Sequence, residues 1–246
     1  MQVSVINDKA QILSRLQREI LPLQGFRPAN DSTVDMGLGP IGQAFPQSVF
    51  PQGAIHEFLA TGPEEAAAGS GFIAGLLSAL MQRGGTAVWI GESRSVFPPA
   101  LKQFGIEPHR VIFIELRKEK EILWAMEEAL KCGALAAVVG ELPELSFTLS
   151  RRLQLAVEQS RVTGFLLRRN SRQLTTTACV TRWKITPLAS TSHDELPGIG
   201  FPQWKVELLK VRNGRPGSWQ VKWEDGRFQP IVQPALFVRE KQIKTA

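Results

Sequence analysis

The chain of 246 residues contains no tyrosine, two cysteines, three histidines and no long apolar run. Cys132 and Cys179 lie far apart, so we expect reduced buried thiols rather than a disulfide. The histidines are isolated from one another and from the cysteines, which excludes the usual ligand spacing of a zinc site. An uninterrupted apolar stretch of about 18 residues, the length that crosses a bilayer, is absent. These absences predict a protein that binds no metal and spans no membrane.

The N-terminus also lacks a cationic start followed by an apolar core, so no signal peptide is expected and the predicted location is the cytoplasm. Hydrophobic residues make up 43% of the sequence, and the mean hydropathy is -0.07. Both values are typical of a globular protein. A single fold of this size buries roughly 70 to 75% of the surface of its unfolded chain, so a sizeable core is expected.

Charge is divided unevenly along the chain. Residues 1–150 contain 12 basic and 16 acidic residues, whereas residues 151–246 contain 17 basic and 7 acidic residues. The two parts therefore carry net charges of -4 and +10. A basic C-terminal part favours a polyanion or an acidic protein as partner. The alternative, that basic side chains only solvate an exposed face, stays open because charge reports association rather than fold.

Strand-like and helix-like segments alternate through the middle of the chain. The expected strands are residues 54–59, 86–90, 111–114, 136–139 and 164–167, and the expected helices are residues 66–83, 97–104, 118–131 and 149–159. This order predicts an α/β fold with a mostly parallel sheet flanked by helices. From residue 179 the apolar period becomes two, and residues 179–185, 203–211 and 218–223 predict an antiparallel β extension at the C-terminal end.

A helix and a connecting arm precede this core. One side of the predicted first helix carries Leu13, Leu16 and Ile20, a stripe that packs either on the core or on a partner. Glycine and proline are frequent in residues 25–53, which indicates an ordered arm. The predicted division is residues 1–53 for helix and arm, 54–229 for the core, and 230–246 for a basic C-terminal tail.

Residues 54–90 have the layout of a phosphate-binding strand, loop and helix without its charged residue. A phosphate loop reads G-x-x-x-x-G-K-[ST], and here no lysine follows the glycines. We interpret this segment as a degenerate phosphate loop containing Gly62, Glu64, Gly69, Ser70 and Gly71. Its glycines form either a residual anion site at a helix N-terminus or merely a tight loop. The tight loop is favoured, because Glu64 and Glu65 would repel phosphate.

The order of these features resembles the core of the RecA-type recombinases. Residues 50–57, FPQGAIHE, resemble the strand that enters the phosphate loop of that family, and residues 210–217, KVRNGRPG, resemble its later hairpin. With the phosphate loop lost, the resemblance is closest to the ImuA family, RecA-like accessory proteins of bacterial damage-induced mutagenesis. It covers about residues 30–225 of the sequence.

The resemblance implies that ATPase chemistry is lost. RecA-type ATPases end the fourth strand with an aspartate that helps to hold Mg²⁺, whereas Glu141 comes one position late and is better explained as a solvated turn residue. Glu92 lies close to the position of their catalytic acid. Without the lysine and the aspartate, phosphoryl transfer loses its main electrostatic stabilisation. We therefore expect no catalytic residue and no cofactor, with a weak ATPase as the least favoured alternative.

The resemblance also implies a role in binding. The expected function is that of a non-catalytic accessory factor in SOS-induced translesion synthesis, which binds ImuB and the error-prone polymerase. Contact with RecA, with single-stranded DNA or with a second copy of the chain is left open. An alternative within the same superfamily is a SulA-like inhibitor of cell division.

Two sets of side chains are predicted to make these contacts. The arginine-rich loop after the fifth strand occupies the place of a DNA-contacting loop in RecA-type proteins, with a solvated polar loop as the alternative. The candidate DNA-binding residues are Arg168, Arg169, Arg172, Arg182, Lys184, Arg212 and Arg215. The candidate partner-binding residues are Leu13, Leu16, Ile20, Trp204, Trp219 and Trp223. For the tryptophans, a place in the core is an open alternative.

Overall fold

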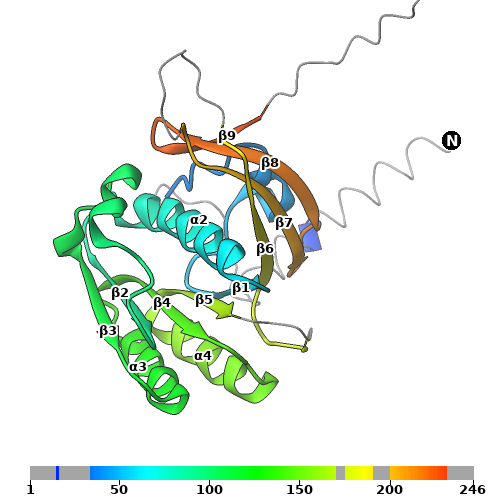
Figure 1. Ribbon diagram of the computed structural model, residues 1–246. Coiled ribbons are helices and arrows are strands. Elements are labelled where there is room, and N and C mark those ends of the chain that lie inside the picture. The colour runs from blue at the N-terminus through cyan, green and yellow to red at the C-terminus, as the bar shows by residue number, and fades with distance from the viewer. Residues whose placement is uncertain (1–14, 17–33, 170–174, 191–199, 232–246) are drawn as a thin grey trace, which may run out of the picture.

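The computed structural model describes residues 15–16, 34–169, 175–190 and 200–231. Its centre is a nine-stranded sheet in the order β3-β2-β4-β5-β1-β6-β7-β8-β9 (Figure 1). The strands are β1 (Ile55–Ala60), β2 (Thr86–Gly91), β3 (Val111–Glu115), β4 (Leu135–Leu142), β5 (Thr163–Arg169), β6 (Thr181–Leu188), β7 (Gln203–Val211), β8 (Gly217–Glu224) and β9 (Arg227–Pro230). Strands β1 to β6 are parallel, and β7, β8 and β9 each run antiparallel to the strand before them.

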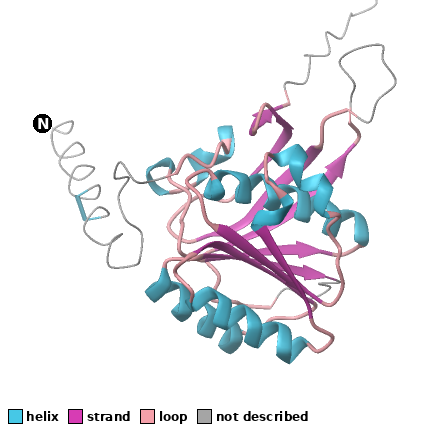
Figure 2. Cartoon of the chain, turned by 90° about the vertical axis from the view of Figure 1, so that its left-hand side faces the viewer, coloured by secondary structure: helices cyan, strands magenta, loops and turns pink. Residues whose placement is uncertain are grey.

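α-Helices lie on the two faces of this sheet, and Figure 2 shows helices on both sides of the strands. Helix α2 (Pro63–Met81) packs on one face, and α3 (Glu119–Lys131) and α4 (Phe147–Ser160) pack on the other. Short 3₁₀ helices complete the described elements: η1 (Gly39–Ala44), η2 (Pro46–Ser48), η3 (Pro98–Phe104) and η4 (Pro108–Arg110). None of the helices in the described residues is long and apolar enough to cross a membrane.

The predicted architecture, a mostly parallel sheet with an antiparallel extension, is confirmed. Two element predictions were inaccurate. The expected helix at residues 97–104 is the 3₁₀ helix η3, which is only seven residues long because Gly105, in the left-handed conformation, ends it; short helical segments are often of the 3₁₀ type. Strand β9, which pairs with β8, was not predicted because its four residues show too little periodicity.

The two faces of the sheet carry separate apolar cores. The core under α2 is rich in aromatic rings, and Phe58 and Trp183 stack there with their centroids 5.9 Å apart. The core under α3 and α4 consists mainly of aliphatic side chains. Because α2 also contacts β6, the α2-side core continues beneath the antiparallel extension and joins it to the parallel strands.

The arm that precedes β1 belongs to the α2-side core. Phe45 and Phe50 are buried, and their rings meet edge to face with centroids 5.4 Å apart. The main-chain N–H of Arg215 donates to the carbonyl oxygen of Ala44 over 2.8 Å, so the arm also holds the hairpin between β7 and β8. The expectation of an ordered arm therefore holds for residues 34–53.

Candidate functional site

The connection between β1 and α2 is only two residues long. Thr61 and Gly62 separate the strand from the helix, which begins at Pro63. Proline is favoured at the first helical position because its missing N–H would have no partner there. Glu64 and Glu65 follow in the first turn, where the partial positive charge of the helix end stabilises acidic side chains. The helix therefore begins three residues before its predicted start at residue 66, and the connection is shorter than expected.

The other members of the predicted phosphate loop lie inside α2. A Cβ atom on Gly69 would sit 3.1 Å from Leu167 of β5, and one on Gly71 would sit 3.2 Å from Trp204 of β7. The hydroxyl of Ser70 donates to the carbonyl oxygen of Ala66 over 2.9 Å. These glycines allow the helix to approach the sheet closely. Neither an anion site nor a tight loop exists at Gly69, Ser70 and Gly71.

A carboxylate of the chain itself occupies the N-terminal end of α2. Glu65 Oε2 accepts the main-chain N–H of Thr61 over 2.9 Å and its hydroxyl over 2.8 Å, and Lys184 Nζ lies 3.1 Å from Glu65 Oε1. Partial burial opposes ionisation of Glu65, but the bonds from Thr61 and Lys184 outweigh it and lower the pKa. The donors of Thr61 and the ammonium group of Lys184 are therefore engaged with Glu65 rather than available to a phosphate group.

A second carboxylate closes the carboxyl end of β4. Glu141 is 4% exposed and accepts hydrogen bonds from the Trp89 indole over 2.7 Å and the Ser95 hydroxyl over 2.5 Å. Arg169 Nη2 lies 2.7 Å from its other oxygen. Glu141 is thus a buried, fully engaged strand residue and not the solvated turn residue favoured from the sequence. Glu92 is exposed in the turn after β2.

Two of the predicted DNA-binding arginines are directed into the protein. Arg168 Nη1 lies 2.8 Å from one oxygen of Glu57, and Arg182 Nε lies 2.7 Å from the other. Glu57 is completely buried, and the exposed fractions of the Arg168 and Arg182 side chains are 2% and 13%. The hydroxyl of Thr177 also donates to Glu57 over 2.9 Å. The prediction that Arg168 contacts DNA is therefore wrong, and Arg182 is mostly withdrawn from solvent.

The other predicted DNA-binding residues are scattered. Arg169 and Lys184 are paired with Glu141 and Glu65 as described, and Arg172 lies outside the described residues. Arg212 is half-buried and donates to the carbonyl oxygen of Ala178 over 3.2 Å. Arg215 is exposed in the hairpin between β7 and β8. DNA contact at Arg212 and Arg215 stays a prediction.

The predicted partner-binding tryptophans mostly belong to the core. Trp204 and Trp223 are each 4% exposed in the α2-side core, so their predicted role in partner binding is wrong. Their alternating positions on β7 and β8 turn them towards α2. Trp219 is partly buried against the same core. Leu16 is 42% exposed, whereas Leu13 and Ile20 lie outside the described residues.

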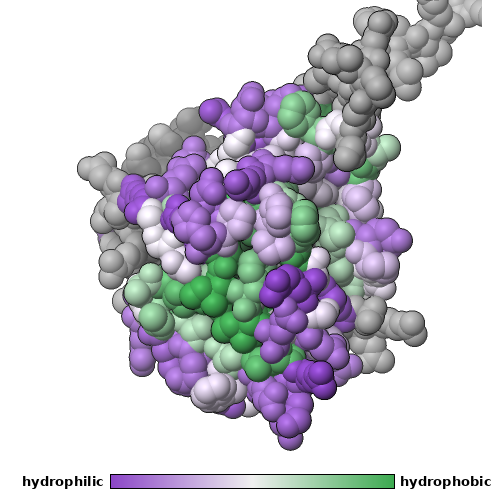
Figure 3. All heavy atoms as spheres, turned by 60° about the vertical axis from the view of Figure 1, so that its left-hand side comes forward, coloured by the Kyte–Doolittle hydropathy of each residue, from purple (hydrophilic) through white to green (hydrophobic). Residues whose placement is uncertain are grey.

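An apolar surface that the sequence did not identify lies at the β3 edge of the sheet. Ile112 is 50% exposed on β3, and Phe97 is 70% exposed in the segment that follows β2. Figure 3 shows this side of the molecule with a continuous apolar area surrounded by hydrophilic residues. The run VIFI resembles a buried parallel strand, and only the strand order shows that it is an edge strand. We call exposed Ile112 with its apolar neighbours on β3 the β3-edge patch.

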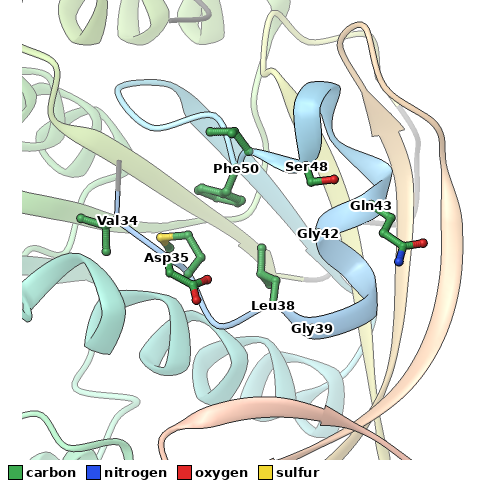
Figure 4. Close-up of a pocket in the computed structure, with 10 residues that line it drawn as sticks. Val34, Asp35, Leu38, Gly39, Gly42, Gln43, Ser48 and Phe50 are labelled. Carbon is green, nitrogen blue, oxygen red and sulfur yellow. The ribbon is translucent and has the colours of Figure 1, made fainter. Parts of the chain in front are cut away.

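The pocket within the arm offers little convergent chemistry. This pocket of about 310 Å³ lies between Val34 and Phe50 (Figure 4). Its one ionisable side chain is Asp35, which accepts the main-chain N–H of Gly37 over 2.9 Å. Within the described residues, no three His, Cys, Asp or Glu side chains come together as a metal site.

Comparisons with known proteins agree with the fold and the sequence resemblance. The sequence matches none of the protein-family profiles with which it was compared. It is 33% identical over 209 residues to Protein ImuA of Caulobacter vibrioides, in strains NA1000/CB15N and ATCC 19089/CIP 103742/CB 15, covering 80% of this chain and 86% of the relative. The crystal structure of the RadB recombinase superposes with a TM-score of 0.56 at 13% identity, covering 81% of this chain and 100% of RadB. The latter likeness concerns the fold alone.

Proposed function

Because this chain belongs to the ImuA family, we propose that it is a non-catalytic accessory factor of damage-induced mutagenesis that acts by binding other macromolecules. Its fold is RecA-like, as the similarity to RadB indicates. In this proposal the RecA-like sheet serves as a scaffold for surfaces that contact ImuB and the error-prone polymerase in SOS-induced translesion synthesis.

The proposal depends mainly on two carboxylates of the chain itself, Glu65 and Glu141, which lie at the C-terminal ends of the parallel strands. In open α/β sheets these strand ends are the usual ligand-binding position. Here Glu65 accepts both donors of Thr61 and pairs with Lys184 beside the N-terminus of α2, and Glu141 is held by Trp89, Ser95 and Arg169. Both carboxylates would repel the phosphates of a nucleotide, and no lysine stands at the start of α2 to offset that repulsion.

We expect no ATP hydrolysis and no tight nucleotide binding. Calorimetry with ATP and Mg²⁺ should give no heat of binding in the low-micromolar range, and phosphate release should equal that of buffer. A RecA-type recombinase with an intact phosphate loop serves as the positive control. Low-micromolar affinity or sustained turnover would overturn the non-catalytic part of the proposal, whatever the partners of the protein are.

The β3-edge patch supports the partner-binding part of the proposal. An edge strand presents main-chain N–H and C=O groups on its outer side, where an extended segment of another protein can add as a further strand. Pairing there would also cover part of Ile112, an exposed apolar side chain of β3. We propose that an extended apolar segment of ImuB occupies this edge.

The substitution Ile112→Lys is expected to weaken capture of ImuB at least tenfold, because a charged side chain would be buried in the contact. Capture of purified ImuB by the full chain measures this effect, and the tubulin-like division protein, the partner of the SulA-like alternative, is the comparison bait. Leu155→Lys is the matched control, since Leu155 is 46% exposed on α4, away from β3. Unchanged ImuB capture by Ile112→Lys would remove the β3 edge from the proposal.

A further inference from the structure

A β-bulge places two like charges opposite each other on the outer face of the antiparallel extension. Val206 and Leu208 of β7 are buried in the α2-side core, so an uninterrupted strand would also direct Lys210 into it. The register shifts between Arg182 and Trp183, and Lys210 pairs with Arg182 on the other face. The extra residue, Leu209, is 44% exposed. Bulges of this kind redirect side chains and are frequent beside functional sites.

Positive charge is in excess around this bulge. Lys210 Nζ donates to the carbonyl oxygen of Thr177 over 2.8 Å, and Arg212 donates to that of Ala178. Neither cation forms an ion pair among the described residues. Among the described residues, Glu57 is the carboxylate that acts on Lys210, and it already neutralises Arg168 and Arg182 in part, while Glu207 of the same strand is paired with Lys205. The group of Arg168, Arg182, Lys210 and Arg212 with Glu57 therefore carries an excess of three positive charges.

This arrangement costs stability in the absence of a ligand. Like charges directly opposite each other in a sheet repel. Partial burial, followed by the neighbouring charges of Arg182 and Arg212, lowers the pKa of Lys210 despite the opposing influence of Cys179 and Glu57. Residue arrangements that lower stability are concentrated at functional sites. A bound anion would reduce the repulsion between the cations around Lys210.

The surroundings favour nucleic acid over other anions. Helices α3 and α4 cover β1, β2 and β4, and among the described elements no helix covers the outer face of β6 and β7 (Figure 2). This open strand surface can follow an extended backbone, as the grooves of single-strand-binding proteins do. Lysine has three donors and arginine five, so both keep donors beyond their carbonyl contacts. Exposed Leu209 adds an apolar contact for a sugar or base beside the cations.

We propose that Lys210 and Arg212, with Leu209 beside them, bind the phosphate backbone of single-stranded nucleic acid. The inference rests on the binding role proposed above and assigns it a second surface, separate from the β3 edge. Arg168 and Arg182 hold Glu57 and the segment 175–178 in place and are positioning residues for this surface. Lys210 was not among the DNA-binding residues predicted from the sequence.

Titration of a labelled oligothymidylate with the full chain at several salt concentrations tests this inference. The double variant Lys210→Gln/Arg212→Gln should bind at least tenfold more weakly, and its log-log salt slope should be smaller by about 0.7 for each phosphate that is no longer neutralised. Lys205→Gln is the matched control, because Lys205 lies on the same strand and is already paired with Glu207 at 3.0 Å. Lys210→Arg, which keeps the charge, should retain binding.

The outcomes separate this inference from the proposed function. Because Lys210 faces Arg182, the double variant should melt at the same temperature as the parent or higher, so weaker binding cannot be ascribed to unfolding. It should also capture ImuB normally. Salt-insensitive binding by the parent, or an unchanged slope in the double variant, would refute the nucleic-acid site while leaving the ImuB proposal intact. Equal displacement by poly-glutamate would refute it in favour of an acidic peptide.

Discussion

Glu57→Gln is expected to lower the free energy of unfolding by about 3 to 5 kcal/mol, the range for breaking a buried ion pair from one side. The substitution keeps the size of the side chain and removes only its charge. Arg168, with 2% of its side chain exposed, and the mostly buried Arg182 would then lack their counter-charge. Arg168 is especially sensitive, because its Nε atom is already buried without a partner.

Urea denaturation at neutral pH measures this loss. Glu158→Gln is the matched control, since Glu158 lies 3.9 Å from Arg151 with 42% of its side chain exposed, and its removal should change stability by less than about 0.5 kcal/mol. Adding Arg168→Met to Glu57→Gln should recover part of the loss, because the unpaired buried charge is then removed. A loss below about 1 kcal/mol for Glu57→Gln would mean that the arginines find other partners.

Stability is also expected to fall by about 2 kcal/mol between pH 7 and pH 5 because of His56. Complete burial, opposed only in part by the bond to Pro51, lowers the pKa of His56 from 6.5 to about 3. Below pH 6.5 the unfolded chain therefore binds a proton that the folded chain does not accept. The contribution of neutral His56 is fully present above pH 6.5 and is lost progressively down to about pH 3.

Burial keeps His56 neutral, and its hydrogen bonds fix which ring nitrogen carries the proton. The Trp183 indole can only donate, and it donates to the Thr181 hydroxyl over 2.6 Å. That hydroxyl donates in turn to His56 Nδ1 over 2.7 Å, and Nε2–H donates to the carbonyl oxygen of Pro51 over 2.8 Å. Because the Pro51 carbonyl can only accept, the single proton of the neutral ring lies on Nε2, and Nδ1 is then the acceptor of the Thr181 hydroxyl.

Denaturation between pH 5 and pH 7, where most carboxylates stay ionised, isolates this effect. The free energy of unfolding of His56→Gln at pH 7 should be lower by about 1 to 3 kcal/mol, because one buried hydrogen bond is lost. Between pH 5 and pH 7 it should change little, because the variant lacks the titrating imidazole. His109→Gln, at an exposed position, should keep the parental slope. If the free energy of unfolding of His56→Gln changed with pH as steeply as that of the parent, the pH dependence would come from other groups.

The alternation of strands and helices was sufficient to predict the fold, because neighbouring parallel strands have to be joined by crossover segments, which are usually helices. The junction of β1 and α2 was not predictable in the same way. Gly69 and Gly71 suggest a loop when only their neighbours in sequence are considered. Their actual role depends on Leu167 and Trp204, about 100 and 130 residues further along the chain.

Part of the charge arrangement could have been inferred from strand periodicity. Glu57 is two residues after buried Ile55, and Arg168 two residues after buried Leu166, so both occupy the inward side of their strands. An inward acid and an inward base on neighbouring strands form a pair. Lys210 could not have been placed, because the bulge beside it breaks the period on which such an inference depends.

The two-residue connection between β1 and α2 also has a consequence for the history of the chain. A phosphate loop needs roughly six residues between its strand and its helix, followed by lysine. Point substitutions cannot supply that length, and an insertion would separate Thr61 from Glu65, which hold the helix end together. Each intermediate would therefore lose stability before it gained a nucleotide. A phosphate loop at this junction would thus need an insertion that the present start of the helix opposes.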